Sequence, residues 1–393
     1  MRKRFFHALL GLFMLFTACC APQIDKKTET MYTWLQTANL SAQETPHELY
    51  QKALEEDTLV IYTITTRITE VKKSFEEQYP GLYVEVQDVK SSEMLGMVQE
   101  NYVSGRFACD IVIGNDNNAE LSKSLVDTGI IFPYIPFDIT PKLKGGHGED
   151  QLYFLDEAQM IYYNSAIYNK VPIQNIWELC EEQYKNKVYM PTPLRSSSTY
   201  GFCAMILSRP EEMAQAYRDY AGKTLEAPEG KNAAEVFLER LVQNVLFTNS
   251  NDEVVEAIGS AAGTGHIGIM ISSKYRLKEV GYHVEPIYRL NPFCGSYAST
   301  SVMIAGGARN INSAKLFVRW LLGETDGTGE GYKPYQTSGT WSARMDVPDG
   351  NDVPQSEIDL LWLDKDYMKE NREYIEAFYE SLLKAYGEQE NEH

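Results

Sequence analysis

Clusters of hydroxyl and basic side chains occur at four places, each after a short apolar run and before a helical pattern. The clusters are Thr65-Thr66-Arg67, Ser91-Ser92, Arg195 with Ser197-Ser198-Thr199, and Ser272-Ser273-Lys274. A helix N-terminus offers unpaired N–H donors and a partial positive charge. Hydroxyl, Arg and Lys side chains add further donors and charge. The clusters therefore predict a site for an anion, in particular a phosphoryl or carboxylate group.

Helix capping is the alternative interpretation of these clusters. Ser and Thr are favoured N-caps whether or not a ligand is near, and one cap is worth about 1 kcal/mol. Capping is the simpler reading of Ser91-Ser92, whereas Arg195 precedes four hydroxyl residues and one cap would suffice. That excess favours ligand contact around Arg195. Arg67 and Lys274 have a second interpretation as solvated surface charges.

The local motifs of nucleotide-binding loops, serine hydrolases and zinc proteases are absent from the sequence. The six histidines are scattered and none pairs at metal-ligand spacing, and the cysteines form no Cys-x-x-Cys pair. Cys109, Cys203 and Cys294 have apolar or small neighbours, which indicates buried thiols. We therefore expect no catalytic residues, no metal site and no cofactor. A secreted hydrolase or transferase with a catalytic pair distant in sequence remains an alternative.

Strand and helix patterns alternate along the chain and would position the clusters. The continuously apolar run at 59–62 predicts a buried strand, and 83–86 and 110–113 predict two more strands. This alternation indicates an α/β architecture with a mainly parallel sheet. In such sheets ligands bind at the carboxyl ends of the strands, where the clusters stand.

The first residues have the pattern of a secretory targeting signal. A basic stretch, Arg2-Lys3-Arg4, precedes an apolar run from Phe5 to Phe16. About twelve helical residues span about 18 Å, too short for a hydrocarbon core of about 30 Å. The run is typical of a secretory signal. The small residues Thr17-Ala18 before Cys19 resemble the lipobox of bacterial lipoproteins, in which the cysteine is acylated. An ordinary signal peptide with an incidental cysteine is the alternative.

Charge and composition exclude several classes of protein. The 393 residues carry a formal net charge of −19, from 36 Lys and Arg against 55 Asp and Glu. This acidic balance argues against non-specific binding to nucleic acid or anionic lipid. A hydrophobic fraction of 44% and a charged fraction of 23% are ordinary for globular proteins. Without a second long apolar run, a multi-span membrane protein is excluded.

Several stretches together resemble the bacterial extracellular solute-binding proteins of ABC importers. They are Thr58 to Thr63, Phe75 to Gly81, Val84-Glu85-Val86, Ala108 to Ile113, Tyr162-Tyr163-Asn164, Trp177-Glu178-Leu179 and Lys187 to Pro191. The resemblance covers most of 58–345. It implies a two-lobe periplasmic-binding-protein-like (type II) fold with a ligand cleft between the lobes. It also implies a monomer that captures a small solute, delivers it to a membrane permease and has no enzymatic activity.

This resemblance also suggests how the chain is divided and where it resides. We expect a signal peptide at 1–18, a lipid-anchored tether and first helix at 19–56, the first part of lobe I at 57–150, lobe II at 151–285, and the return to lobe I with C-terminal helices at 286–393. Lobe closure would occur about a hinge near 150–165 and 285–300. Acylated Cys19 would anchor the protein outside the cytoplasm, in the periplasm or on the outer face of the cell membrane.

Within that family the chain is most similar to the ferric-iron-binding branch and its relatives. Iron-binding members place adjacent tyrosines just after the last strand of the second lobe. The matching stretch, Gly265 to Tyr275, has Ser272-Ser273-Lys274 there and Tyr275 alone. A lysine would repel ferric iron, so this departure favours relatives that bind sugar phosphates or phosphonates. Ferric iron remains the alternative ligand.

Overall fold

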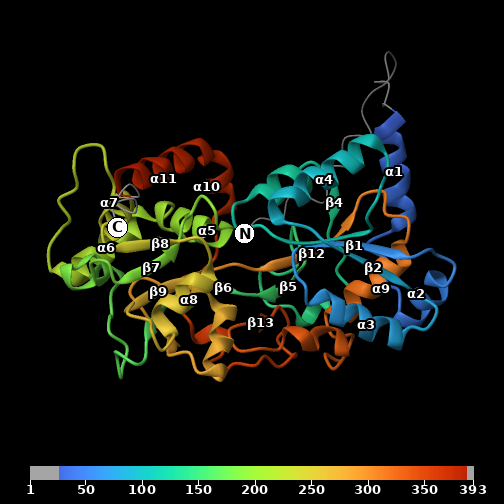
Figure 1. The fold of residues 1–393 in the computed structure, drawn as a ribbon. Helices are drawn as coiled ribbons and strands as arrows, with labels where there is room; N and C mark the ends of the chain where they lie inside the picture. The colour runs from blue at the N-terminus through green and yellow to red at the C-terminus, as the bar shows by residue number, and fades with distance from the viewer. Residues whose placement is uncertain (1–25, 387–393) are drawn as a thin grey trace, which may run out of the picture. The chain divides into compact units, whose positions relative to one another are not determined.

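The computed structural model describes residues 26–386, with side chains from 31 to 385 except those of Ser91 and Ser92. The chain divides after Asn39 into two compact units (Figure 1). The first contains helix α1 (Lys26–Ala38), where the sequence predicts a polar tether. Met31, Trp34 and Leu35 recur there at the three-and-four spacing of an amphipathic helix. The predicted signal peptide and Cys19 lie outside the described residues.

The second unit contains two sheets, and the first of them forms lobe I. Its strands are β1 (Leu59–Thr63), β2 (Val84–Asp88), β3 (Ile111–Asn115), β4 (Ile131–Phe132), β5 (Tyr153–Asp156), β12 (Thr300–Ala305) and β13 (Trp341–Ser342). Their order is β13-β5-β12-β3-β1-β2, with β4 beside β12. β1 runs parallel to β2 and β3 and is buried along its length apart from half-buried Val60. Burial on both faces explains its continuously apolar sequence.

Helices cover both faces of this first sheet. They are α2 (Pro46–Ala53), α3 (Ile68–Gln78), α4 (Ser91–Ser104) and α9 (Ile311–Leu321). On one side Phe75 of α3 meets Phe317 of α9, with ring centroids 5.1 Å apart. On the other side Met94 and Val98 of α4 pack against Val112 of β3 in a buried cluster.

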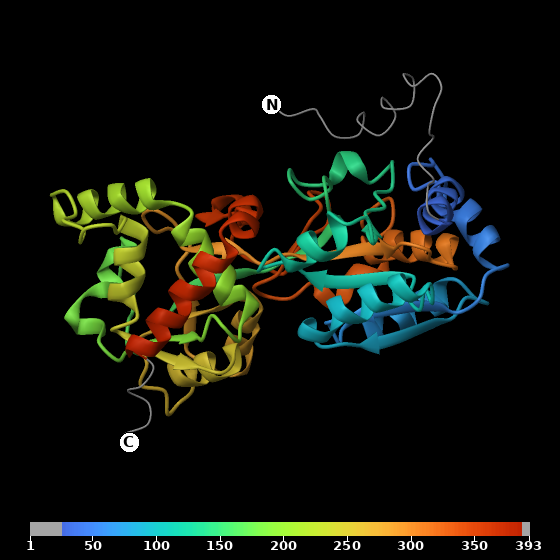
Figure 2. The same cartoon turned by 90° about the horizontal axis from the view of Figure 1, so that it is seen from above.

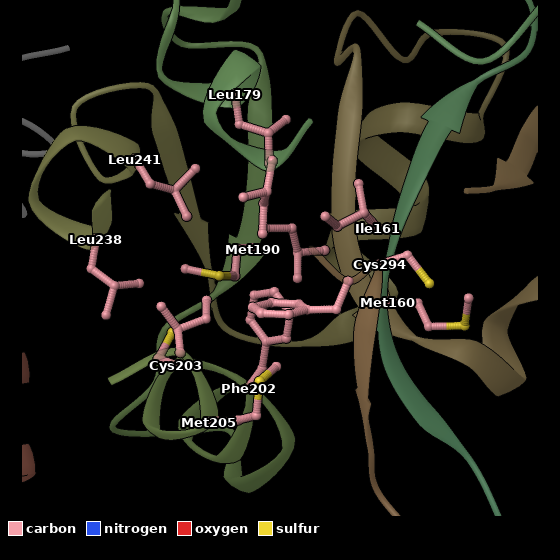
Figure 3. Close-up of a cluster of buried hydrophobic side chains, with 14 of the residues drawn as sticks. Met160, Ile161, Leu179, Met190, Phe202, Cys203, Met205, Leu238, Leu241 and Cys294 are labelled. Atoms are coloured by element: carbon pink, nitrogen blue, oxygen red, sulfur yellow. The ribbon is translucent and has the colours of Figure 1, made fainter. Parts of the chain in front are cut away.

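The second sheet forms lobe II. Its strands are β6 (Ala158–Asn164), β7 (Val188–Pro191), β8 (Val245–Thr248), β9 (Ile267–Ile271), β10 (Val284–Pro286), β11 (Gly295–Tyr297) and β14 (Leu360–Leu361). Their order is β14-β11-β6-β9-β7-β8, with β10 beside β6. Its helices are α5 (Ser197–Leu207), α6 (Pro210–Ala221), α7 (Ala233–Leu241) and α8 (Asn251–Gly259). Phe202 and Met205 of α5 lie among Met190 of β7 and Ile161 of β6 in the core of this lobe (Figure 3).

Short helical turns complete the connections. They are η2 (Ser122–Val126), η3 (Thr140–Lys142), η4 (Ile176–Cys180), η5 (Glu182–Tyr184), η6 (Ser272–Val280), η7 (Glu330–Tyr335) and η8 (Gln355–Glu357). The three cysteines expected as buried thiols, Cys109, Cys203 and Cys294, are buried and free. Burial raises the pKa of Cys109 and Cys203 to about 12, so both remain protonated thiols.

Crossing segments join the two lobes. The chain leaves lobe I after β5, passes through Glu157 and enters β6, and it returns from β11 to β12 through Ala298 and Ser299 (Figure 2). The Ala298 amide donates to the Glu157 carbonyl at 2.8 Å, which ties the two crossings together. Residues 343–359 connect β13 of lobe I to β14 of lobe II. The expected α/β fold with two lobes is confirmed.

Two C-terminal helices, α10 (Lys365–Glu370) and α11 (Arg372–Tyr386), end the described chain. Met368, Ile375, Tyr379 and Leu382 are buried in the hydrophobic cluster of lobe II. These side chains recur at helical spacing, so one face of α11 is fixed to lobe II and its other faces remain free for polar contacts.

No helix among residues 26–386 combines the length and the apolar composition that a bilayer crossing requires.

Candidate functional site

The segments that follow the central parallel strands of both sheets come together between the lobes. β1 and β3 are parallel in lobe I, as are β7 and β9 in lobe II. The Ser197 hydroxyl of α5 lies 3.5 Å from Asn115 Oδ1 at the end of β3. A Cβ atom on Gly201 would lie only 2.4 Å from the Asn117 carbonyl oxygen. Helix α5 therefore approaches the backbone of lobe I closely.

A cavity of about 560 Å³ lies beside this contact and is bounded by three parts of the chain. Lobe I contributes Ile64, Met94, Leu95, Gly114, Asn115, Asn118, Glu120 and Leu121. Lobe II contributes Pro193, Leu194, Arg195, Ser196, Ser197 and Tyr200, and α11 contributes Arg372, Glu376 and Glu380. Small-molecule sites have volumes of roughly 300–1,000 Å³ and a few polar groups on a largely apolar wall. The size and lining of this cavity suit a small polar solute.

Arg195 and Ser197 are the predicted site residues that line this cavity. Arg195 is exposed, and its guanidinium donates to Asn249 Oδ1 at 2.6 Å. Because an amide oxygen carries no charge, this contact leaves the positive charge of Arg195 unneutralised. The N-terminus of α5, whose first turn begins at Ser197, adds its unpaired amides to the same side.

The other hydroxyls of this cluster are committed to the fold. Ser196 is the N-cap of α5, and its oxygen accepts the Thr199 amide at 3.4 Å. Thr199 is fully buried and accepts from Gln159 Nε2 of β6 at 3.2 Å. Ser198 is buried, with its oxygen 3.2 Å from that of Ser196. The capping interpretation therefore describes Ser196, and the hydroxyls of Ser198 and Thr199 lie outside the cavity lining.

An acidic group with one arginine also lines the cavity. Arg372 of α11 forms ion pairs with Glu120 of lobe I and, at 2.9 Å, with Glu376. Tyr200 is buried, and its hydroxyl has no hydrogen-bond partner within the described part of the chain. Burial raises the pKa of Tyr200 to about 12; Arg372 opposes this shift, and Glu376 and Glu120 reinforce it. The Tyr200 hydroxyl is therefore a neutral donor near the cavity.

Predicted residues also meet at a second place, around Glu157 of the first crossing. Burial raises the pKa of Glu157, while a hydrogen bond from Ser273 and the charges of Arg67, Arg276 and Lys274 oppose the shift. Arg67 comes from lobe I, and Ser273 and Lys274 come from lobe II. None of these side chains is among those that line the cavity.

Existing contacts occupy several of these side chains. The Arg67 guanidinium donates to the Pro334 carbonyl and to Thr337 Oγ1, both at 3.3 Å. Lys274 forms an ion pair with Asp252 at 2.5 Å. Ser272 is fully buried, accepts the Ala158 amide at 2.9 Å and donates to the Gly339 carbonyl at 2.5 Å. The Ser272 hydroxyl thus holds the crossing segment in place.

The remaining predicted residues lie in turns or beyond the described side chains. The Thr65 amide donates to Thr63 Oγ1 at 3.1 Å, and Thr66 is exposed in the turn before α3. Ser91 and Ser92 begin α4, and their side chains lie outside the described part. Among the residues that the structure describes, no group of three His, Cys, Asp or Glu is placed to hold a metal ion.

Most of the polar side chains that line the cavity were not predicted from the sequence. Asn115 and Asn118 follow a predicted strand in the same way as the hydroxyl clusters, so their position was readable from the sequence. Arg372, Glu376 and Glu380 recur every four residues, which places them along one stripe of α11. That spacing predicts a polar face of the helix, but it does not predict that this face borders the cavity.

The comparisons identify solved structures with the same fold. No protein-family model and no curated protein sequence matches the chain. Apo ferric ion-binding protein A of Pasteurella haemolytica is similar with a TM-score of 0.62 and 15% identity, over 86% of this chain and 99% of that one. The Trichodesmium protein IdiA (FutA), in complex with iron and citrate, is similar with a TM-score of 0.61 and 17% identity, over 84% of this chain and 99% of that one.

A third similar structure was solved with a sugar phosphate bound. The periplasmic binding protein AfuA of Actinobacillus pleuropneumoniae, with exogenous fructose-6-phosphate, gives a TM-score of 0.58 and 18% identity, over 84% of this chain and 98% of that one. At these identities the likeness establishes the fold. The chain has the two-lobe fold of periplasmic binding proteins.

Proposed function

We propose that this chain is the substrate-binding component of an ABC importer. It captures a small anionic solute, such as a sugar phosphate or a phosphonate, between its lobes and delivers it to a membrane permease without chemical change. The observation that carries this proposal is the cavity of about 560 Å³ to which both lobes contribute polar side chains. The shared fold supports it, because binding proteins of this architecture close by hinge motion around a ligand.

The preference for an anion follows from the α5 side of the cavity. Arg195 brings a positive charge, and its hydrogen bond to the uncharged amide of Asn249 leaves that charge unneutralised. Ser197 and the first-turn amides of α5 supply further donors, and the amide of Asn118 can donate from lobe I. A phosphoryl group bound there would face donors from both lobes. Such a ligand would stabilise the arrangement in which the lobes are in contact.

Ferric iron is not favoured by the surroundings of its expected ligand position. The lone Tyr275 donates to Glu285 Oε2 at 3.0 Å and accepts from Lys278 at 3.1 Å. Burial raises the pKa of Tyr275, so a phenolate ligand would be costly to form. Lys274 and Arg276 stand beside it in the chain and would repel a trivalent cation.

The proposal includes the location and the state of the chain. We propose that Cys19 is acylated after removal of the signal peptide and that the protein acts as a monomer outside the cytoplasm. A lipid-anchored protein needs no basic patch for membrane attachment, in keeping with the net charge of −19.

Ligand screening of the full mature chain tests this function. Thermal-shift assays and calorimetry with glucose 6-phosphate, methylphosphonate, glucose and ferric citrate should show binding of a phosphorylated compound and recovery of that compound unchanged. Arg195→Ala should weaken this binding tenfold or more, since a charge-assisted hydrogen bond is worth about 1.5–3 kcal/mol. Arg289→Ala is the matched control, because Arg289 is exposed and pairs with Asp359 outside the cavity. Binding of ferric citrate alone, unaffected by Arg195→Ala, would contradict the proposal, and turnover would indicate an enzyme.

A further inference from the structure

We propose that the pair of His147 and Asp156 is a proton-dependent lock on the crossings between the lobes. With both nitrogens of the imidazole ring protonated, the pair ties the crossings together, and loss of one proton loosens them. This inference goes beyond solute capture, because it concerns the hinge of the solute-free chain. Neither residue is among those that line the cavity.

The carboxylate of Asp156 links all three connections between the lobes. Asp156 is the last residue of β5, directly before the first crossing, and it is fully buried. Its Oδ1 accepts from the hydroxyl of Ser299, in the second crossing, at 2.6 Å. Its Oδ2 accepts from Nε2 of Gln355, in the third connection 343–359, at 2.9 Å. The Gln355 amide is oriented by Lys144, whose Nζ donates to Gln355 Oε1 at 2.7 Å.

His147 supplies the counter-charge of this buried carboxylate. The residue is 2% exposed, its Nε2 lies 2.7 Å from Asp156 Oδ2, and its Nδ1 lies 3.1 Å from the Gly145 carbonyl oxygen. Both partners accept hydrogen bonds, whereas a neutral imidazole carries a donor at only one of its nitrogens. Both contacts are satisfied only when both nitrogens are protonated, so this geometry requires the charged imidazolium.

Removal of one of these protons would break the lock. The lone pair left on the ring would face either the Gly145 carbonyl or the Asp156 carboxylate, so the ring would have to move. The carboxylate would then stay buried with only the neutral donors Ser299 and Gln355. A buried charge that has lost its partner is strongly destabilising. The crossings that meet at Asp156 would therefore loosen.

The ring of His147 also contacts lobe II. It packs edge to face on Trp362, which follows β14, with ring centroids 5.2 Å apart. Trp362 stacks on Tyr297 of β11, with centroids 4.1 Å apart and an interplanar angle of 11°. A Cβ atom on the neighbouring Gly146 would lie 3.7 Å from the same indole. Movement of the His147 ring would therefore disturb a contact between the lobes as well as the carboxylate.

Other titratable groups surround the pair. They are Lys144 on the loop of His147, Asp349 in the third connection, Tyr153 of β5, Tyr297 of β11, Tyr332 of η7 and Lys365 of α10. Burial raises the pKa of the three tyrosines, to about 12 for Tyr297, so they stay neutral near neutral pH. Burial lowers the pKa of Lys144, and the charges of Asp156 and Asp349 oppose this shift.

Lys365 keeps its charge. Burial would lower its pKa, but the charges of Asp116 and Tyr153 and its hydrogen bonds to them raise it. An imidazole is the side chain that gains and loses a proton between about pH 5 and 8. His147 is therefore the member of this cluster that we expect to couple the crossings to pH in that range.

Hydrogen exchange of the solute-free full chain at pH 6 and pH 8 tests the lock. The probe is the Ala298 amide, which donates to the Glu157 carbonyl and so joins two crossings. After correction for the intrinsic pH dependence of exchange, we expect this amide to exchange about tenfold faster at pH 8 than at pH 6. In His147→Gln, which keeps a neutral donor for Asp156, exchange should be fast at both pH values. His47→Gln, an exposed histidine of α2, is the matched control and should keep the wild-type dependence.

A second measurement needs only the wild-type chain. In ¹⁵N NMR of histidine-labelled protein at pH 6, both nitrogens of the buried ring, identified by its slowly exchanging N–H protons, should be protonated. An unprotonated nitrogen on that ring would overturn the inference. Equal exchange of the Ala298 amide at the two pH values would overturn it too, as would a pH dependence that survives His147→Gln. None of these results depends on the identity of the solute.

Discussion

At the scale of single residues, the ion pair of Asp138 with Arg319 shows how lobe I holds a buried charge. The Arg319 guanidinium, fully buried in α9, donates to both oxygens of Asp138 at 2.7 Å. Burial would raise the pKa of Asp138, but hydrogen bonds from Arg319 and Thr325 and the charge of Arg319 outweigh it. The pKa falls from 3.8 to about 2.

The substitution Asp138→Asn tests this pair. It should destabilise the protein by about 3 kcal/mol above pH 4, because it removes the closest counter-charge of a buried guanidinium and leaves only Glu324, at 3.8 Å, beside it. A depressed carboxyl pKa stabilises the native state above the unfolded pKa and loses this effect as pH falls through the native value. The difference between wild type and variant should therefore shrink between pH 4 and about 2. Urea unfolding across this range measures it, and a difference independent of pH would contradict the assignment.

Residue types and spacing in the sequence predicted part of the candidate site. Arg195 and Ser197 line the cavity, as expected for the richest cluster. The sequence could not show that Ser272 and Thr199 are buried, because a hydroxyl before a helix looks the same whether it faces a ligand or the core. Nor could it pair Glu120 with Arg372, which are 252 residues apart. Such contacts depend on how whole elements pack.

At the scale of elements, α5 matters because of its close approach to lobe I. Gly201 stands in the middle of this helix, where glycine costs up to about 1 kcal/mol relative to alanine. A Cβ atom at this position would lie only 2.4 Å from the Asn117 carbonyl oxygen, so glycine is required for this contact.

Gly201→Ala should force the two lobes apart at this contact. We expect weaker solute binding, by about tenfold, and a larger radius of gyration in X-ray scattering, with circular dichroism unchanged because each lobe keeps its own core. Gly96→Ala in α4 is the matched control: no atom lies within 4 Å of its Cβ position. That variant should bind normally and be stabilised slightly. A normal radius of gyration and normal binding in Gly201→Ala would contradict the role of this contact.

Element types were more predictable than element roles. The apolar run of β1 and the periodic pattern of α3 are set by local sequence, and the structure has both. The segment 26–38, expected to be a tether, forms α1, because its few apolar residues are spaced for a helix face. The spacing of Arg372, Glu376 and Glu380 did not show that they line the cavity, because this depends on how the opposite face of α11 packs on lobe II.

At the scale of the whole second unit, the C-terminal helices connect the lobes through charge. Lys365 pairs with Asp116 at 2.7 Å, Lys369 with Asp127 at 3.0 Å, and Arg372 with Glu120. The basic partners lie on helices that are buried in lobe II, and the acidic partners lie on one segment of lobe I. These pairs therefore resist separation of the lobes.

High salt should weaken this connection, since the Debye length falls to about 3 Å at 1 M. We expect Lys365→Ala/Lys369→Ala to increase the radius of gyration of the solute-free chain at low salt, and to make that radius less sensitive to salt than in wild type. Lys185→Ala, an exposed lysine paired with Glu182, is the control. Identical scattering curves for the double variant and wild type would show that the pairs do not hold the lobes.

At this scale the alternation of strands and helices in the sequence predicted the α/β architecture, and the resemblance to solute-binding proteins implied its two lobes. The division of the chain at 150/151 and 285/286 stays a prediction, as do the signal peptide and the lipid anchor. The composition of the cavity wall could not be foreseen, because it brings together three distant parts of the chain.

The most direct test of the central claim is hydrogen exchange of the full chain with and without a saturating concentration of the phosphorylated compound that binds in the ligand screen. We predict simultaneous protection of 114–120 in lobe I, 195–201 in lobe II and 372–380 in α11, because the solute would lie between them. Protection confined to one lobe, or confined to 272–280 and the crossing at Glu157, would contradict binding in this cavity.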